Sequence, residues 1–317
     1  MRIVYFGSGA FGLPTLEMLA RRHELAAVVT QPDKPAGRGR TPRPTPVGQW
    51  AAQHLPSVAV LKPQSVNEAP VRDQLHALDA QAWVVIAFGQ KLGRRLLGDR
   101  LAINLHASLL PRWRGAAPIH AAILAGDPTT GLSVITLADE MDAGLVLAQS
   151  TRAIDPSWTA GQLHDLLAQD GPALVQQVLE RAAAGSLQGV QQDPARVTYA
   201  PRLTRADGWI DLAQTAEECR RRVHGLTPWP GVSVRIGPHT VKLLHVAEAP
   251  HRHQATPGML LDPAGLVACG QGTSLTLLEV QPAGRRAMDF ASFARGHRLH
   301  AGQQITPEHA PCTRSGT

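Results

Sequence analysis

The residues best suited to chemistry are an asparagine and a histidine at the end of an apolar run. Asn104 and His106 follow residues 101–103, Leu-Ala-Ile, which are typical of a buried strand. Side chains two residues apart lie on the same face of a strand, so the amide and the imidazole should lie side by side. An amide N–H can stabilise an oxyanion, and an imidazole can move a proton. The pair therefore predicts a site that polarises a carbonyl group.

A carboxylate further along the chain can complete this site. Asp142 lies in the turn 139–144, between two apolar runs. Such a carboxylate either orients the imidazole and favours its charged form, or accepts a proton directly. A strand-end Asn or His is more often a turn or core residue, and an Asp before Ala-Gly is more often a turn former. Against these structural alternatives, we hypothesise that Asn104, His106 and Asp142 form one catalytic site.

The elements that must position this site are short apolar strands alternating with helical patterns. The strand-like runs are Ile3–Phe6, Leu25–Val29, Val58–Leu61, Ala82–Ala87, Leu101–Asn104 and Leu132–Leu137, and helical patterns lie at Pro14–Arg22 and Val71–Ala80. This alternation predicts an α/β fold with a doubly wound, mostly parallel, Rossmann-like sheet. Ligands of such sheets bind at the carboxyl ends of strands, where the Asn/His pair is expected.

The last third of the chain changes character and predicts a second, smaller domain. After the helical patterns Thr159–Ala184 and Thr215–Gly225 come five short strands, which suggest an OB-like β-barrel: Val232–Ile236, Val241–Val246, Met259–Leu261, Leu266–Cys269 and Ser274–Val280. A length of 317 residues also favours two domains. We expect a catalytic domain over 1–188, a linker over 189–205, a barrel domain over 206–306 and a disordered tail over 307–317.

Composition limits the class of protein. With 44% hydrophobic and 18% charged residues the chain is typical of a globular protein, and its three cysteines show no paired spacing. No apolar run is long enough to span a membrane, and the first residues predict a strand, not a signal peptide. We expect a cytoplasmic protein with no metal and no membrane contact. The net charge of +6 is compatible with a polyanionic partner or with a generally Arg-rich composition.

Two loops of the first domain suggest different ligands. Residues 7–12, GSGAFG, match the glycine pattern of dinucleotide-binding turns, with Asp33 further on, although tight packing alone also favours glycine there. The loop 31–46 is long for a strand–helix connection, and it is rich in proline and basic residues, namely Lys34, Arg38, Arg40 and Arg43. Arginine binds phosphates in forked geometry, so this loop favours a nucleic-acid contact over an ordinary solvated loop.

Taken in order, the segments TQPDKPAGRGR, INLHASLLPRWRGAAPIHAAILAGD, EMDAGLVL, VTYAPRLTRADGWIDL, LTPWPG and QPAGRRAM span nearly the whole chain. They resemble the methionyl-tRNA formyltransferases. The block around Asn104 marks the wider group of enzymes that use 10-formyltetrahydrofolate. The chain departs from the family at Ser8-Gly9, where Thr-Pro is usual, at Phe88, where Tyr is usual, and at Leu145, where a second acid is usual. Asn104, His106 and Asp142 match.

The resemblance implies a transferase of translation initiation. Its formyl donor would be 10-formyltetrahydrofolate, without a metal, and its acceptor the α-amine of initiator Met-tRNA. It implies that Ser108, Leu109, Leu110 and Pro111 hold the folate, with Phe88 and Gly89 in the opposite wall. It further implies that Lys34, Arg38, Arg40 and Arg43 contact the tRNA acceptor stem, with backbone contacts from some of the arginines at 220–222, 285, 286 and 298. We expect a monomer.

Three alternatives remain open from the sequence. A formyltransferase of the glycinamide-ribonucleotide type would share the catalytic trio but needs neither the second domain nor the basic loop. An NAD-dependent oxidoreductase would explain the glycine turn but not residues 104–118. A non-catalytic RNA-binding module would explain the charge but not the Asn/His pair.

Overall fold

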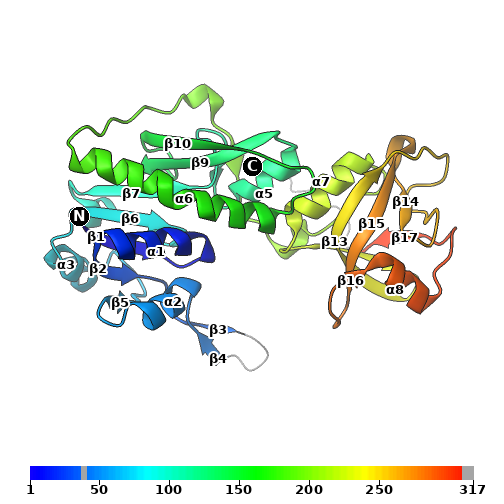
Figure 1. Cartoon of the computed structure of the whole chain (residues 1–317), viewed down its shortest axis with the longest axis horizontal. Coiled ribbons are helices and arrows are strands. Elements are labelled where there is room, and N and C mark those ends of the chain that lie inside the picture. The colour runs from blue at the N-terminus through cyan, green and yellow to red at the C-terminus, as the bar shows by residue number, and fades with distance from the viewer. Residues whose placement is uncertain (37–40, 309–317) are drawn as a thin grey trace. The chain divides into compact units, whose positions relative to one another are not determined.

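The first half of the chain folds into one twisted sheet, seen in the computed structural model in Figure 1, which describes residues 1–36 and 41–308. Within these residues seven strands follow the order β10-β9-β7-β6-β1-β2-β5. They are β1 (Arg2–Gly7), β2 (Glu24–Val29), β5 (Ala59–Leu61), β6 (Ala82–Ile86), β7 (Leu101–His106), β9 (Thr129–Thr136) and β10 (Val146–Ala153). The pairs joining β5, β2, β1, β6 and β7 are parallel, and β9 is antiparallel to β7. The doubly wound, mostly parallel sheet is confirmed.

Helices cover both faces of this sheet, and β7 shows which side chains face which layer. In Figure 1, α1 (Leu13–Arg22) and α6 (Ala160–Ala183) cross the near face. Leu105 of β7 lies against Gly171 of α6, where a Cβ would come within 2.8 Å of the Leu105 Cδ2 atom. Ala102 belongs to the opposite core, which α3 (Ala69–Ala77) and α4 (Arg94–Leu97) cover. Because strand residues alternate, Asn104 and His106 share the Ala102 face, as predicted.

The last third of the chain forms a curled antiparallel sheet, a half-barrel. Its order is β14-β15-β13-β12-β17, with β16 paired to β15. The strands are β12 (Val232–Ile236), β13 (His239–Ala249), β14 (Leu266–Ala268), β15 (Ser274–Pro282), β16 (Met288–Asp289) and β17 (Ile305–Pro307). The predicted strand at 259–261 is reduced to isolated bridges, Met259 with Gln304 and Leu260 with Val267, which lie between the two edges of the sheet. Helix α8 (Phe290–His297) packs against β15 and β16.

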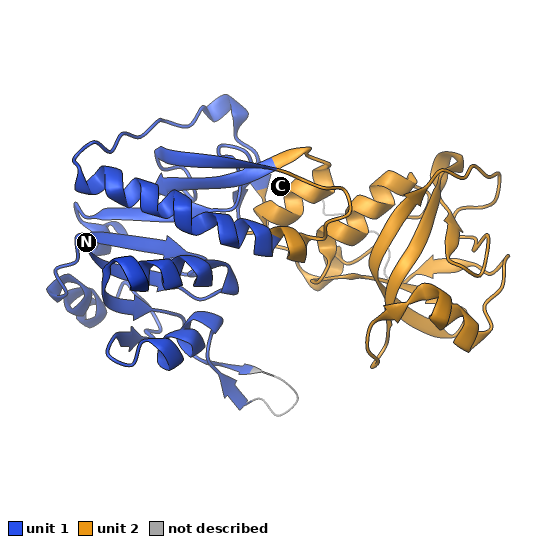
Figure 2. Ribbon diagram, in the orientation of Figure 1, with its two compact units in different colours: residues 1–115, 130–152, 164–199 blue, residues 116–129, 153–163, 200–317 orange. Residues whose placement is uncertain are grey.

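The chain divides into two compact units, coloured in Figure 2. The first comprises residues 1–115, 130–152 and 164–199, and the second comprises 116–129, 153–163 and 200–317. Helices α5 (Pro118–Ala125) and α7 (Ala216–Leu226) therefore belong with the half-barrel. The segment expected to be a linker, 189–205, contributes to both units. The first two residues of the expected tail belong to the half-barrel, since Pro307 ends β17 and the Glu308 amide donates to the Ser233 carbonyl (3.0 Å). Residues 309–317 lie outside the described chain.

Two kinds of feature are absent from residues 1–36 and 41–308. No helix there has the length and apolar character needed to cross a membrane. No group of three or more His, Cys, Asp or Glu residues in that part of the chain could hold a metal ion.

Candidate active site

The three residues predicted to be catalytic lie together in the first unit. The Asp142 Oδ2 atom lies 3.6 Å from His106 Nδ1, and Asn104 Nδ2 lies 3.5 Å from Asp142 Oδ1. Asn104 and His106 come from the end of β7, and Asp142 comes from the loop between β9 and β10. The imidazole and the carboxylate are both shielded from solvent, since the His106 side chain is 7% exposed and the Asp142 side chain 12%. The arrangement places an amide, an imidazole and a carboxylate at the carboxyl end of one strand.

The imidazole of His106 is held at both nitrogens. Its Nε2 lies 2.9 Å from the carbonyl oxygen of Trp113, which can only accept, so Nε2 carries a hydrogen. Trp113 has a φ of 63°, a left-handed conformation that an L-residue rarely adopts. The Trp113 amide in turn donates to the Thr198 hydroxyl (2.9 Å). A further proton on the ring can therefore reside only on Nδ1, facing Asp142.

The loop that carries Asp142 is shaped by close backbone contacts. The Thr136 amide donates to the Leu145 carbonyl (3.0 Å), and the Leu145 amide donates to the Thr136 hydroxyl (2.9 Å). A Cβ at Gly144 would lie 1.7 Å from the Thr136 carbonyl oxygen, so only glycine fits. Asp142 itself has a φ of 55°. The turn predicted at 139–144 is thus shaped by the close approach of Gly144 to Thr136, and it brings Asp142 to His106.

Three residues that sequence reasoning did not assign also hold this loop. The Gly115 amide donates to Asp142 Oδ2 (2.9 Å). Arg114 and Gln192 are buried and contact the same loop. Arg114 and Gly115 lie inside the segment 104–118 that the sequence singled out. Gln192 lies in the expected linker, where no local pattern marks it.

The residues expected to hold a folate, 108–111, form a loop tied to β9. The Ser133 hydroxyl donates to the Ser108 carbonyl (2.6 Å) and accepts from the Leu110 amide (3.0 Å). The Gln149 side chain donates to the Leu110 carbonyl (2.9 Å). The peptide bond between Leu110 and Pro111 is cis. Because these backbone groups of Ser108 and Leu110 are already bonded, the loop presents mainly the partly exposed Leu109 and Pro111 side chains to a ligand.

The other expected wall, Phe88 and Gly89, follows β6. The Phe88 ring is 2% exposed and packs edge-on against Phe6, with centroids 5.5 Å apart, so it faces the core. The Phe88 carbonyl accepts from the Ser8 hydroxyl and from Gln31 Nε2. Gly89 has a φ of 81°. Any contact of this turn with a ligand would therefore use its backbone and not the Phe88 ring.

The glycine turn at residues 7–12 has a packing explanation. A Cβ at Gly12 would lie 2.0 Å from the Tyr5 hydroxyl oxygen, and one at Gly7 would lie 2.6 Å from the same side chain. The Tyr5 hydroxyl donates to the Gly12 carbonyl (3.1 Å). Asp33, the acid expected of a dinucleotide site, is paired with Lys62 at 2.7 Å. The glycines make room for Tyr5, and the structure gives no support to the dinucleotide alternative.

The basic loop folds in part as a hairpin. Strand β3 (Lys34–Ala36) pairs antiparallel with β4 (Thr41–Arg43), in a register that sets Lys34 opposite Arg43. Directly opposed residues share a face, and both side chains are exposed. The other two expected contacts, Arg38 and Arg40, lie outside the described residues.

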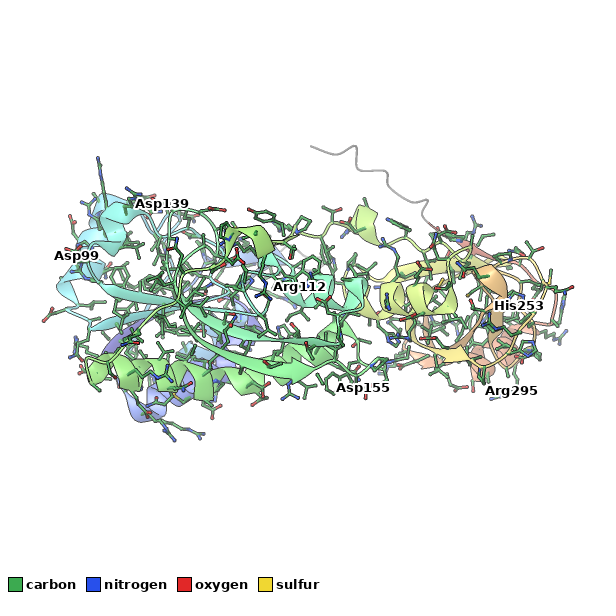
Figure 3. All side chains as sticks on the ribbon, turned by 90° about the horizontal axis from the view of Figure 1, so that it is seen from above. Asp99, Arg112, Asp139, Asp155, His253 and Arg295 are labelled. Carbon is green, nitrogen blue, oxygen red and sulfur yellow. The ribbon has the colours of Figure 1, made fainter. Side chains whose placement is uncertain are left out.

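The arginines of the second unit divide into structural and exposed ones. Arg220 is paired with Glu248 (2.8 Å), Arg221 with Glu217, and Arg222 donates to the carbonyls of Trp209 and Asp207 (2.6 Å each). Burial lowers the pKa of Arg222 to about 10. Arg285, Arg286 and Arg298 are exposed on the surface of this unit, as is Arg295, which is labelled in Figure 3.

Comparison with known proteins identifies two family matches along the chain. Residues 1–179 match the family described as formyl transferase, and residues 202–298 match the formyl transferase C-terminal domain. The first match includes the whole Asn/His/Asp cluster and the basic hairpin. The second includes α7 and most of the half-barrel.

Curated relatives and solved structures agree with these matches. The chain is 39% identical to a methionyl-tRNA formyltransferase of Methylobacterium sp. over 96% of this chain and 99% of that protein. It is 40% identical to one of Heliobacterium modesticaldum over 95% and 99%. WlaRD, a sugar 3N-formyl transferase solved in the presence of dTDP and 5-N-formyl-THF, shares the fold with a TM-score of 0.65 at 13% identity, over 90% of this chain and 99% of that chain. HypX from Aquifex aeolicus, in complex with tetrahydrofolic acid, gives a TM-score of 0.61 at 16% identity, over 92% of this chain and 46% of that chain.

Proposed function

Because this chain belongs to the methionyl-tRNA formyltransferase family, we propose that it transfers the formyl group of 10-formyltetrahydrofolate to the α-amine of methionyl initiator tRNA. The observation that carries the proposal is the convergence of Asn104, His106 and Asp142 at the end of β7. Formyl transfer needs a donor for an oxyanion and a route for a proton, and this cluster supplies both.

The reaction joins two substrates through a tetrahedral intermediate. The amine nitrogen bonds to the formyl carbon, and the carbonyl electron pair moves to the oxygen. The bond from that carbon to folate N10 then breaks, the amine loses one proton and N10 gains one. Asn104 donates an N–H to the oxyanion without itself titrating, and its long 3.5 Å contact with Asp142 leaves the amide free to turn toward a substrate.

The proton is handled by His106 and Asp142 as a pair. Because Nε2 is bonded to the Trp113 carbonyl, the proton that is exchanged resides between Nδ1 and the Asp142 carboxylate. The pair accepts the proton of the attacking amine and returns it to the leaving nitrogen. An imidazolium held there also stabilises the oxyanion by its charge.

The two substrates would contact different parts of the first unit. Ser108–Pro111, with the backbone of Phe88 and Gly89, would hold 10-formyltetrahydrofolate, the fit resting on the partly exposed Leu109 and Pro111 side chains. Lys34 and Arg43, with Arg38 and Arg40, would bind phosphates of the tRNA acceptor stem. Single-stranded ends are the part of an RNA that proteins read most readily.

A two-acceptor assay tests the proposal. The protein is incubated with 10-formyltetrahydrofolate and with either initiator or elongator Met-tRNA, and the esterified amino acid is identified by mass spectrometry. We expect formylmethionine on the initiator alone. Formylation of neither tRNA would refute the proposal. In a separate reaction with glycinamide ribonucleotide as acceptor, formylation of that compound in place of the tRNA would assign the chain to the alternative acceptor.

A further inference from the structure

Gln192 is buried beneath the loop that carries Asp142, although it lies in a segment expected to be a linker. The residue is 7% exposed. Its Nε2 donates to the carbonyl oxygens of Asp142 (2.7 Å) and Gly144 (2.8 Å). A primary amide has two N–H donors, so both are used. One side chain thus holds the loop backbone at Asp142 and two residues beyond it.

Arg114 fixes the orientation of that amide. Its Nε donates to Gln192 Oε1 (3.0 Å), and arginine has no acceptor, so the oxygen of Gln192 must face Arg114 and the nitrogen must face the loop. A terminal guanidinium nitrogen of Arg114 donates to Glu140 (3.1 Å) in the same loop. The Arg114 side chain is 8% exposed and that of Glu140 is 64% exposed. Arg114 therefore connects Gln192 with the first half of the loop.

The backbone around Gln192 is also bound to the first unit. Val190 and Val146 exchange two backbone hydrogen bonds of 2.8 Å each. Gly189 lies against Leu145 so closely that a Cβ would come within 2.7 Å of the Leu145 Cβ. This segment is therefore fixed independently of the Gln192 side chain, which makes it a rigid support for the loop.

We infer that Gln192 and Arg114 are positioning residues that hold the Asp142 carboxylate against His106. Asp142 has a φ of 55°, which an aspartate adopts at a cost, and its neighbour Met141 is 68% exposed, so the loop has little packing of its own to keep this shape. The carboxylate also accepts from Gly115, the residue after Arg114. Misplacing a catalytic group by about 1 Å costs on the order of a hundredfold in rate. The inference rests on the proposed function and assigns roles within its site.

The substitution Gln192→Glu tests the donor role specifically. Glutamate has the same shape and still accepts from Arg114, but it sets an oxygen against two carbonyl oxygens. We expect kcat for formyl transfer to fall about tenfold to a hundredfold, with KM for both substrates within about threefold. Gln191→Glu is the matched control, because it makes the same charge change one residue away on an exposed side chain. A kcat for Gln192→Glu within about twofold of that control overturns the inference.

Two further measurements separate positioning from folding and from the proposed function. Arg114→Lys keeps the charge but cannot reach Gln192 and Glu140 together, so it should also lower kcat without raising KM. Amide hydrogen exchange over residues 138–146 should become about tenfold faster in Gln192→Glu and stay unchanged in Gln191→Glu. If the exchange rate is unchanged in both Gln192→Glu and Gln191→Glu, the inference is overturned, whether or not the wild-type protein formylates a tRNA. If the wild-type protein formylates no tRNA, that result alone counts against the proposed function only.

Discussion

Replacing Asp142 by asparagine removes the negative charge of the site while keeping its shape. The carboxylate oxygen lies 3.6 Å from His106 Nδ1, and both side chains are largely shielded from solvent. At an effective dielectric constant of about 20, opposite charges at this distance attract by about 4–5 kcal/mol. That energy is available to the reaction only when the imidazolium forms, so its complete loss corresponds to a rate loss of about one thousandfold to five thousandfold.

The expected loss in Asp142→Asn is between about a hundredfold and a few thousandfold in single-turnover formylation of initiator Met-tRNA. The lower bound allows for the Gly115 amide, which still has an oxygen to donate to in the variant. Because the change concerns charge and not contact, the affinities for folate and tRNA should hardly move.

Asp139→Asn provides the control for this experiment. Asp139 lies three residues earlier, is exposed, and pairs with Arg94 at the surface, where its label can be found in Figure 3. The Arg94 guanidinium beside it holds the pKa of the Asp139 carboxyl below its usual range. An ion pair in full contact with solvent is strongly screened and contributes little, so the control should keep nearly the full rate. If Asp142→Asn also keeps a rate within about threefold of the wild type, the proposed role of Asp142 is refuted.

Two other predictions concern the RNA contact and the stability of the second unit. The double variant Lys34→Ala with Arg43→Ala should raise KM for tRNA and leave KM for folate unchanged. It should also reduce the slope of log K for tRNA binding against log[salt] by roughly 1.4–1.8. The control is Arg21→Ala with Arg22→Ala on α1, and a slope equal to that of the control would exclude a contact at this hairpin. Burial lowers the pKa of His224 to about 4, below its ordinary value near 6.5, so the unfolded state binds more protons at acid pH and stability falls as pH drops from about 6.5 to about 4. Between pH 7 and pH 5 the free energy of unfolding should fall by about 2 kcal/mol, as measured by urea-dependent hydrogen exchange of the amides in α7 and β13. His224→Gln should abolish this fall, whereas the exposed His251→Gln should leave it unchanged.

Local periodicity was enough to predict six of the seven strands of the first sheet and the shared face of Asn104 and His106, but it did not predict β10. Alternation along β7 is a property of six consecutive residues, so no distant part of the chain is needed to infer it. The short helix α8 went unpredicted because eight residues give too few turns for a periodic pattern, although Asp289 caps it by accepting from the Ser292 amide (2.7 Å).

The support of the site could not be predicted, because it depends on contacts between distant residues. Gln192 reaches the Asp142 carbonyl across 50 positions of sequence, and Arg114 reaches Gln192 across 78. Nothing in the polar segment around Gln192 differs from an ordinary linker. The glycine turn shows the converse: its pattern suggested a dinucleotide, but the requirement for glycine comes from the buried Tyr5 side chain.

The net charge of +6 includes arginines that are not available to bind RNA. Three arginines of the second unit are committed within that unit: Arg220 donates to the Pro156 carbonyl (2.6 Å) as well as to Glu248, Arg221 is paired with Glu217, and Arg222 stacks on Trp209 at 3.4 Å. A guanidinium that already satisfies carbonyls or carboxylates gains little from a phosphate, because the old bonds must break first. Composition therefore overstates the basic surface, and the cations with exposed side chains, such as Lys34, Arg43 and the pair Arg285 and Arg286, are the ones whose removal should alter the salt dependence of binding.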